Sequence, residues 1–177
     1  MGAVKCYDIA RVHEWKDEVR AGDAVLLSGY LYTARDAAHK RIIQALDSGE
    51  KLPFDLNGAC VYYAGPTQTP DGMVIGSIGP TTSSRMDSFT PRLLDLGLSI
   101  MIGKGPRSQS VVDAIGRNKA LYFSAVGGAG AYIANCVKSC EVVAYDDLGC
   151  ESIKRLYVED FLVFCGIDTN KNSIFNR

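Results

Sequence analysis

The sequence predicts an α/β domain in which helices cover a mixed sheet. Three observations support this class. The chain has 177 residues, enough for one domain with a sizeable core. Apolar residues make up 47% and charged residues 22% of it, as in an ordinary globular protein. In the second half, short runs rich in β-branched and aromatic residues alternate with runs of helical periodicity, a pattern typical of sheets connected by helices.

The first half of the chain predicts a strand, a helix and then two more strands. AVLLSGYLYTA, at 24–34, is rich in Val, Leu and Tyr and predicts a strand. RDAAHKRIIQALDSGE, at 35–50, has apolar residues at helical spacing and Gly49 as a stop, so it predicts a helix. ACVYYAGP, at 59–66, and MVIGSIGP, at 73–80, predict strands that could pair as a hairpin around an Asp-Gly turn.

The second half predicts shorter elements that alternate. Helices are expected at 86–97, 108–119 and 129–139. Strands are expected at 99–105, 120–128, 141–149 and 160–168. We expect an N-terminal arm or lead-in at 1–22 and a single domain at 23–177, because no later change of composition suggests a boundary.

Composition argues against several classes of function. The net charge of -1 gives no global attraction for nucleic acid. No apolar run approaches the roughly 20 residues of a membrane helix, and the first residues lack the apolar centre of a signal peptide. We therefore expect a cytoplasmic protein without membrane or nucleic-acid partners. The six cysteines are scattered without a CxxC pair, and neither histidine is near one, so we expect reduced thiols and no metal site.

Polar residues gather at four predicted strand-to-helix junctions. These are TARD at 33–36, GPTTSSRMD at 79–87, GKGPRSQS at 103–110 and GGAGA at 127–131. Sites in mixed α/β folds form where strands end, and helix N-termini there offer N–H groups and a positive dipole end. Four cations lie at or beside the junctions, namely Arg35, Arg85, Lys104 and Arg107. Because guanidinium groups grip carboxylates through paired hydrogen bonds, we predict a pocket for a compound with two anionic ends.

Simpler explanations apply to each feature alone. Any one of these cations could be a solvated residue at a helix start. The glycines of GGAGA complete neither a dinucleotide fingerprint nor a phosphate loop, and close packing of a helix on a strand explains them as well. His39 lies four residues after Arg35 on the same helix face. It could contact a ligand, act as a general acid or be hydrogen-bonded only locally.

Taken in order, these motifs resemble the β subunit of class I fumarases and L-tartrate dehydratases. GPTTSSRMD is followed by MIGKGPRS, YFSAVGGAGA and VVAYDDLGCESIKRLYVEDF, and it is preceded by GYLYTARDAAHKRI and GACVYYAGPTQTPDGMVIGSIG. The resemblance extends from about Asp23 to the C-terminus. It implies a swivelling domain of the β/β/α type and a hydro-lyase, fumarate hydratase, of the tricarboxylic acid cycle.

The resemblance also implies a cofactor and a partner. In the family, an α part carries the cysteine ligands of a 4Fe–4S cluster, whose open iron acts as a Lewis acid on the substrate hydroxyl. The β part closes over that cluster. This chain is too short to hold both parts, and its cysteines lack any cluster spacing. We therefore expect a β subunit that is active only with an iron–sulfur α subunit and that could self-associate when isolated.

The resemblance assigns roles to residues of the junctions. The reaction implied is reversible hydration of fumarate to (S)-malate. The ARD motif places a substrate arginine at Arg35, the GPTTxxRMD motif places a threonine and an arginine at Thr81 and Arg85, and the KG motif places a lysine at Lys104. Thr81, Arg85 and Lys104 would be catalytic as well as substrate-binding, and Arg35 would bind substrate. His39 joins the substrate-binding residues because of its position four residues after Arg35.

Two alternatives stay open. The β subunit of L-tartrate dehydratase shares these motifs, although the extra hydroxyls of tartrate would need further partners. A non-catalytic module would bind dicarboxylates tightly by itself, whereas half of a shared site would bind them weakly. Asp36 and His39 flank the ARD motif and could orient Arg35.

Overall fold

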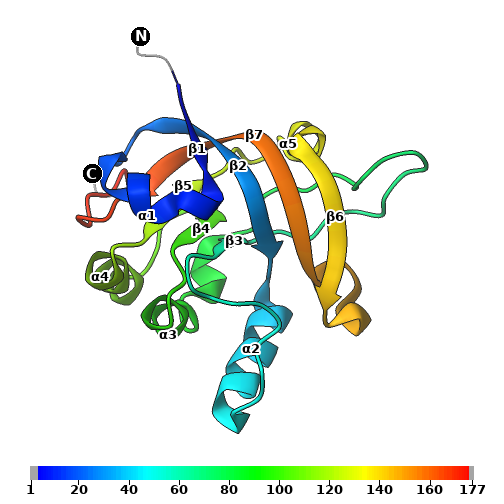
Figure 1. Cartoon of the computed structure of the whole chain (residues 1–177), viewed down its shortest axis with the longest axis horizontal. Helices are drawn as coiled ribbons and strands as arrows, with labels where there is room; N and C mark the ends of the chain where they lie inside the picture. The colour runs from blue at the N-terminus through cyan, green and yellow to red at the C-terminus, as the bar shows by residue number, and fades with distance from the viewer. Residues whose placement is uncertain (1–3, 176–177) are drawn as a thin grey trace.

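The computed structural model describes residues 4–175, which form a seven-stranded mixed sheet with helices packed on it (Figure 1). The strands are β1 (Lys5–Asp8), β2 (Ala24–Thr33), β3 (Cys60–Tyr62), β4 (Ile100–Gly103), β5 (Leu121–Ser124), β6 (Val137–Ala144) and β7 (Ile153–Ile167). The α-helices are α1 (Val12–Trp15), α2 (Asp36–Ser48), α3 (Thr90–Asp95), α4 (Gln109–Asn118) and α5 (Gly130–Cys136). Short 3-10 turns are η1 (Ile9–Arg11), η2 (Lys16–Glu18), η3 (Ser83–Met86) and η4 (Asp146–Glu151). The predicted α/β class with a mixed sheet is confirmed.

The sheet closes on itself through its longest strand. From β1 to β5 every neighbouring pair is parallel, and β7 runs antiparallel to β2, β5 and β6. Because β7 pairs with both β2 and β5, a closed circuit of pairings runs through β2, β3, β4, β5 and β7. Parallel β2, β3 and β4 end at the same edge, and that edge carries the residues discussed below.

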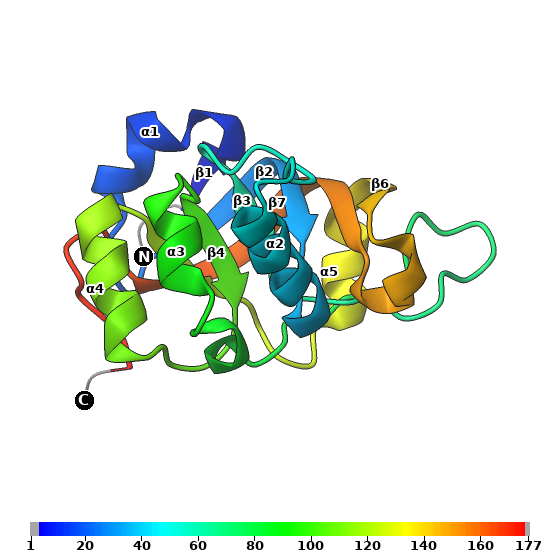
Figure 2. The same ribbon diagram turned by 90° about the horizontal axis from the view of Figure 1, so that it is seen from below.

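Two hydrophobic clusters cover the two faces of the parallel strands. In β4, Ile100 and Ile102 belong to one cluster, and Met101 between them belongs to the other. The second cluster is covered by α2, α3 and α4, which lie side by side on one face (Figure 2). Strands buried on both faces are apolar throughout, which is why β3 and β4 read as short continuous apolar runs.

The structure confirms most of the predicted elements of the first half. The strand at 24–34 is β2, and the helix at 35–50 is α2. Gly49 ends α2 in the left-handed conformation, with φ of 68° and its N–H donating to the last turn, as a C-terminal glycine is expected to do. The helix expected at 86–97 is shorter, because the GPTTSSRMD segment first forms the η3 turn and α3 begins only at Thr90.

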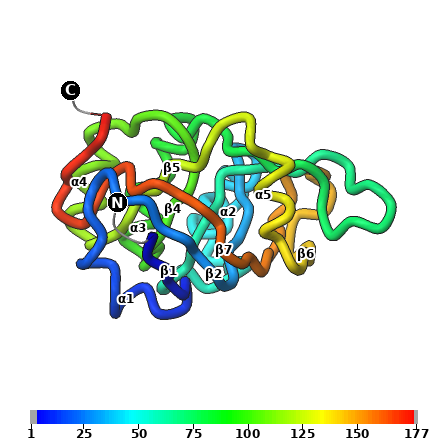
Figure 3. The backbone as a smooth tube through the Cα atoms, turned by 90° about the horizontal axis from the view of Figure 1, so that it is seen from above, coloured from blue at the N-terminus to red at the C-terminus, as the bar shows by residue number. Residues whose placement is uncertain are grey.

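The strand predicted at 73–80 is wrong. This segment keeps only an isolated antiparallel bridge between Ala64 and Pro80, so no hairpin forms. Its two core residues, Ile75 and Ile78, are three positions apart and cannot lie on one face of a strand. The preceding residues, 67–74, are exposed, and the loop that they form projects beyond β6 (Figure 3).

The last elements differ from prediction in their boundaries. The helix expected at 129–139 ends at Cys136, because VKSCEVVA pairs with β7 as strand β6. The strand expected at 141–149 ends at Ala144, where the chain turns through Tyr145 into η4. β7 begins at Ile153 rather than near Asp160, since the alternating burial of its first residues puts one face in the core.

The N-terminal segment packs on the sheet. β1 lies parallel to β2, and Ile9, Val12, Trp15 and Val19 are buried in the first cluster. Residues 1–3 of the predicted arm or lead-in lie outside the described residues. Within 4–175, none of the helices has the length and apolar character needed to cross a membrane.

Candidate functional site

The candidate site lies at the edge where β2, β3 and β4 end. Arg35 follows β2, and Lys104 follows β4. An isolated parallel bridge joins Thr82 to Lys104, so the GPTTSSRMD segment reaches the same edge. The structure therefore brings together all four predicted junctions, because β5 runs parallel to β4 and a Cβ on Gly127 of GGAGA would lie 3.9 Å from Cδ of Lys104.

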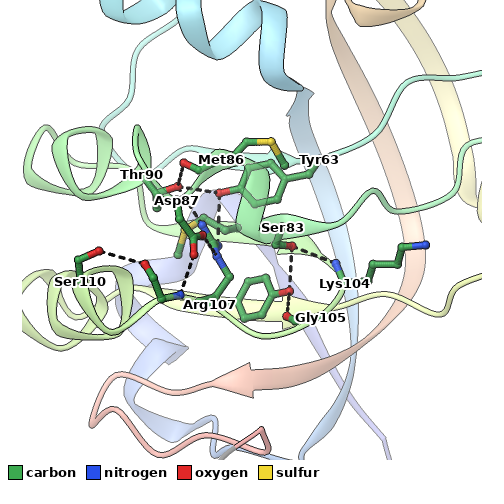
Figure 4. Close-up of polar contacts among 12 residues, drawn as sticks. Tyr63, Ser83, Met86, Asp87, Thr90, Lys104, Gly105, Arg107 and Ser110 are labelled. Carbon is green, nitrogen blue, oxygen red and sulfur yellow. Dashed lines mark hydrogen bonds and ion pairs between the residues drawn. The ribbon is translucent and has the colours of Figure 1, made fainter.

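Backbone hydrogen bonds fix the start of GPTTSSRMD. The N–H of Thr81 donates to the carbonyl of Tyr63 at 2.7 Å, and the N–H of Lys104 donates to the carbonyl of Thr81 at 3.2 Å. The buried Ser83 hydroxyl accepts from the N–H of Lys104 at 3.0 Å and lies 2.9 Å from the hydroxyl of Tyr122 (Figure 4). Ser83 is therefore a core residue that supports the segment, while Thr81 remains partly exposed.

Arg85 connects this segment to α2. Its Nη2 donates to Oγ1 of Thr81 at 3.0 Å and lies 3.3 Å from Oδ2 of Asp36. The Arg85 side chain is still 45% exposed, so the guanidinium is held at one end and open to a ligand elsewhere. Asp36 was expected to orient Arg35, but it pairs with Arg85 instead.

Arg35 pairs with Glu151, which was not among the predicted site residues. Its Nη2 lies 3.2 Å from Oε1 of Glu151, and the two side chains are only 23% and 24% exposed. The Nε of Arg35 is buried without a hydrogen-bond partner among the described residues. Glu151 ends the η4 turn between two antiparallel strands, and no motif or spacing links it to α2.

Lys104 is the cation of this edge that has no carboxylate partner. Within residues 4–175, no carboxylate oxygen lies within 4.0 Å of its ammonium group, and its side chain is exposed. Figure 4 shows the side chain extending away from the network around Ser83. The edge thus presents three cations against two carboxylates, and an anion would be attracted to it.

His39 lies behind Arg35 and not on the open edge. It is 1% exposed, and its ring packs against those of Tyr63 and Phe89. Nδ1 lies 2.9 Å from the carbonyl of Arg35, which can only accept, so Nδ1 carries the proton. Burial lowers the pKa of His39 to about 4, and the imidazole is therefore neutral near pH 7. This position suits support of Arg35 better than direct contact with substrate.

Arg107, the fourth cation expected in the anion pocket, lies elsewhere. Its side chain is fully buried, and its Nε donates to Oδ1 of Asp87 at 2.7 Å. Nη2 donates to Thr90 at 2.9 Å, and the guanidinium carbon lies 5.3 Å and 5.0 Å from the ring centroids of Tyr63 and Tyr122 (Figure 4). The prediction for Arg107 is wrong, because the guanidinium is already satisfied inside the domain.

Two helix N-termini expected to face an anion are occupied by carboxylates of the chain itself. The N–H of Ala37, in the first turn of α2, donates to Oε2 of Glu151 at 3.2 Å. The N–H of Ser108, at the start of α4, donates to Oδ2 of Asp87 at 2.7 Å. The charged side chains, rather than the helix ends, therefore remain to attract a ligand.

One glycine of GGAGA, Gly130, serves close packing. A Cβ on Gly130 would lie 2.4 Å from Oγ of Ser77 and 3.0 Å from the backbone nitrogen of Gly79. This close approach accounts for glycine without any nucleotide. The six cysteines are free thiols, and residues 4–175 contain no group of three or more His, Cys, Asp or Glu side chains suited to a metal ion.

Comparison with known proteins gives a consistent family. The profile of the family described as Fumarase C-terminus matches residues 4–177. "Fumarate hydratase class I, aerobic" of Escherichia coli K12 is 42% identical over 153 residues, which is 85% of this chain and 28% of that protein. "Fumarate hydratase 2" of Leishmania major is 37% identical over 171 residues, or 96% of this chain and 30% of that protein. The chain thus spans less than a third of the length of these fumarate hydratases.

A shorter relative matches along most of its own length. The "Putative L(+)-tartrate dehydratase subunit beta" of Methanocaldococcus jannaschii is 40% identical over 166 residues. The match covers 90% of this chain and 85% of that protein. The relatives of this chain thus include a protein of similar length as well as the longer fumarate hydratases.

Proposed function

The chain belongs to the family described as Fumarase C-terminus, its relatives include proteins named fumarate hydratase class I and putative L(+)-tartrate dehydratase subunit beta, and we propose that it is the β subunit of a class I fumarate hydratase. In this role it contributes half of a site for the reversible hydration of fumarate to (S)-malate. The observation that carries the proposal is the contact of Arg85 with Thr81 and Asp36. These residues lie at the same edge of the sheet as Arg35, which follows β2, and Lys104, which follows β4.

The cations of this edge would hold the two carboxylates of the substrate. Arg35 and Arg85 each pair with a carboxylate of the chain through one nitrogen, Nη2, and retain further N–H groups for a ligand. Lys104 can neutralise the charge that builds on a carboxylate when the adjacent carbon loses its proton. Thr81 accepts a hydrogen bond from Arg85, so a negative charge on its oxygen during proton transfer would be stabilised by the guanidinium.

A 4Fe–4S cluster belongs to this proposal as a group held by another chain. Clusters of this type are held by several cysteine thiolates, but Cys60, Cys136 and Cys165 are buried, and residues 4–175 offer no group of three or more ligands. The described residues therefore do not fit the cluster, and we assign it to an iron–sulfur α subunit. The name of the M. jannaschii relative, a subunit beta matched over 85% of its length, favours such a division.

The swivelling β/β/α description of the domain is part of the same proposal. The closed circuit of β2, β3, β4, β5 and β7, with α2, α3 and α4 on one face, gives a rigid body that carries Arg35, Thr81, Arg85 and Lys104 together. A domain that closes over a partner's cluster needs such a preformed edge, because each side chain must arrive in a fixed position.

Reconstitution of the full chain with a cysteine-bearing α chain tests the proposal. The two chains are purified together, loaded with iron and sulfide without oxygen, and assayed with fumarate, malate and L-tartrate. We expect hydratase activity on fumarate in the complex and none in either chain alone. Activity with L-tartrate only would overturn the fumarase assignment and support the dehydratase that the M. jannaschii relative represents by name.

A non-catalytic dicarboxylate-binding module is the third candidate, and titration of the chain alone separates it from the enzyme. An open edge that supplies half of a site should bind fumarate weakly, because the partner's groups are missing. Tight binding by the isolated chain, together with an inactive complex, would favour the module.

A further inference from the structure

The η4 turn lies against the start of α2 and carries two of the contacts that fix this helix. At one end of the turn, Asp147 pairs with Arg41 through both carboxylate oxygens. At the other end, Glu151 reaches Arg35 and Ala37. The turn therefore contacts α2 at two places about one and a half helical turns apart.

Glu151 performs two functions with one carboxylate. Its Oε1 lies 3.2 Å from Nη2 of Arg35, and its Oε2 accepts the N–H of Ala37 at 3.2 Å. Arg35 occupies the N-cap position of α2, and its own side chain makes no capping hydrogen bond. Glu151 thus provides the cap that the local sequence lacks, and it fixes the guanidinium of the same residue from above the helix start.

The turn that carries Glu151 is itself held in place. Lys154 is 8% exposed, and its ammonium donates to the carbonyl of Gly149 at 3.0 Å and to Oγ of Ser152 at 2.6 Å. A Cβ on Gly65 would lie 2.8 Å from the carbonyl oxygen of Cys150 and 3.3 Å from Cδ of Arg35. The turn, the segment after β3 and the Arg35 side chain are therefore in close contact, which leaves Glu151 little freedom to move.

We propose that Glu151 is a positioning residue that fixes the Arg35 guanidinium for the substrate carboxylate, an inference that rests on the function proposed above. The pair leaves one guanidinium nitrogen, Nη1, and the exposed fraction of the side chain for the ligand. The Glu151 carboxylate also sets the charge at this point. With Arg35 present it orients a cation, and without Arg35 it is a bare anion beside the place where a dicarboxylate binds.

The Glu151 carboxylate should aid substrate binding when Arg35 is present and oppose it when Arg35 is absent. This difference can be measured on the reconstituted complex. Glu151→Gln keeps an oxygen for the N–H of Ala37 but loses the charge that holds Arg35. We expect the KM for fumarate to rise roughly tenfold with a smaller change in kcat, because binding in the ground state and in the transition state is weakened alike. In an Arg35→Ala background, the same substitution should leave the KM unchanged or lower it, since it removes a repulsive carboxylate.

Asp147→Asn is the matched control, because it removes a carboxylate from the same turn without touching Arg35. Its KM should stay within about twofold of the wild-type value, as expected for an exposed ion pair. The nitrogen NMR signals of the Arg35 guanidinium give a readout on the full chain alone. They should show restricted rotation in the wild type and in Asp147→Asn, and faster rotation in Glu151→Gln.

The two proposals fail separately. A wild-type complex that does not hydrate fumarate overturns the proposed function. A wild-type complex that is active, with a KM raised equally by Glu151→Gln whether or not Arg35 is present, overturns the positioning role and leaves the function intact. Arg35 signals that are identical in the wild type and in Glu151→Gln also overturn it, whatever the complex does.

Discussion

At the scale of single residues, Arg85 is held by a hydroxyl and a carboxylate on one side and is open on the other. Its Nη2 contacts Thr81 at 3.0 Å and Asp36 at 3.3 Å, while 45% of its side chain remains accessible. This arrangement fixes the direction of the planar group before any ligand arrives. A planar fork with five donors can satisfy both residents and a substrate carboxylate at the same time, which an ammonium group cannot do.

Arg85→Lys should therefore reduce activity much more than stability. We expect kcat/KM of the reconstituted complex with fumarate to fall by about 100-fold or more, while the free energy of unfolding of the chain changes by less than about 0.5 kcal/mol. Steady-state kinetics and urea unfolding measure the two quantities. Arg92→Lys is the control, because Arg92 is 46% exposed and also pairs with an aspartate, but it lies on α3 away from the edge. Near-normal turnover of Arg85→Lys would contradict a substrate role.

His39 predicts a pH dependence of stability. The pKa of His39 is lowered to about 4, chiefly by burial, whereas an unfolded histidine titrates near 6.5. Between these values the unfolded chain binds a proton that the folded chain excludes, so the contribution of the neutral ring is complete above about pH 6.5 and is lost as the pH falls toward 4. The loss over this window is on the order of 3 kcal/mol.

Urea unfolding at several pH values measures this dependence against a variant. In His39→Asn, the side-chain amide can still donate to the carbonyl of Arg35, but no group at this position titrates in the window. The variant should be less stable at pH 7, and its stability should fall less steeply between pH 6.5 and 4.5 than that of the wild type. Parallel curves for the two proteins would show that His39 does not contribute.

At the scale of elements, the sequence predicted correctly the helices and strands in which the spacing of apolar residues agrees with the spacing of buried residues. α2 has its apolar residues at helical spacing and a glycine at its end, and both features are local. The prediction of a strand at 73–80 was wrong because the apolar residues of this segment are buried by loop packing and not by pairing with a strand. The predicted boundary between α5 and β6 was wrong because pairing with β7, which comes later in the chain, decides where the helix ends.

The end of β4 gives a prediction about element packing. A Cβ on Gly103 would lie 2.0 Å from Oγ of Ser83 and 2.8 Å from Cδ2 of Tyr63, so the strand approaches the GPTTSSRMD segment too closely for any side chain. Gly103→Ala should destabilise the chain by about 3 kcal/mol through overpacking. Gly79→Ala is the control, since its Cβ would have no heavy atom nearer than 3.9 Å. Denaturant unfolding compares them, and equal stabilities would show that the edge can relax.

At the scale of the whole molecule, the site consists of local motifs combined with contacts that only the fold creates. Arg35, Thr81, Arg85 and Lys104 each stand in a recognisable motif, so the sequence could point to them and to a common edge. The partner of Arg35 could not be found in this way. Glu151 is 114 positions away from the Ala37 whose N–H it binds, and it meets Arg35 only because β7 returns beside β2. The prediction for Arg107 was wrong for the opposite reason. Its motif places it at a junction, but its side chain is buried in the domain, where it already has hydrogen-bond partners.

The Arg107 network ties several elements of the domain to one another. Its guanidinium contacts Asp87 and Thr90 and lies over the rings of Tyr63 and Tyr122. Asp87 in turn accepts the N–H of Ser108, the N-cap residue of α4, and the carbonyl of Tyr63 accepts the N–H of Thr81. The end of β3, the end of GPTTSSRMD and the starts of α3 and α4 therefore depend on one buried cation.

Arg107→Lys should consequently destabilise the whole domain. A lysine keeps the charge but cannot bind Asp87 and Thr90 together, and the carboxylate of Asp87, which is only 12% exposed, is left with fewer partners, so we expect a loss of about 3 kcal/mol. Arg117→Lys is the matched control, because Arg117 also binds an aspartate through two nitrogens but is 52% exposed, and its loss should stay below about 1 kcal/mol. Both values come from urea unfolding. If the two variants lose the same stability, the buried network does not hold these elements together, and the edge must be maintained by the sheet alone.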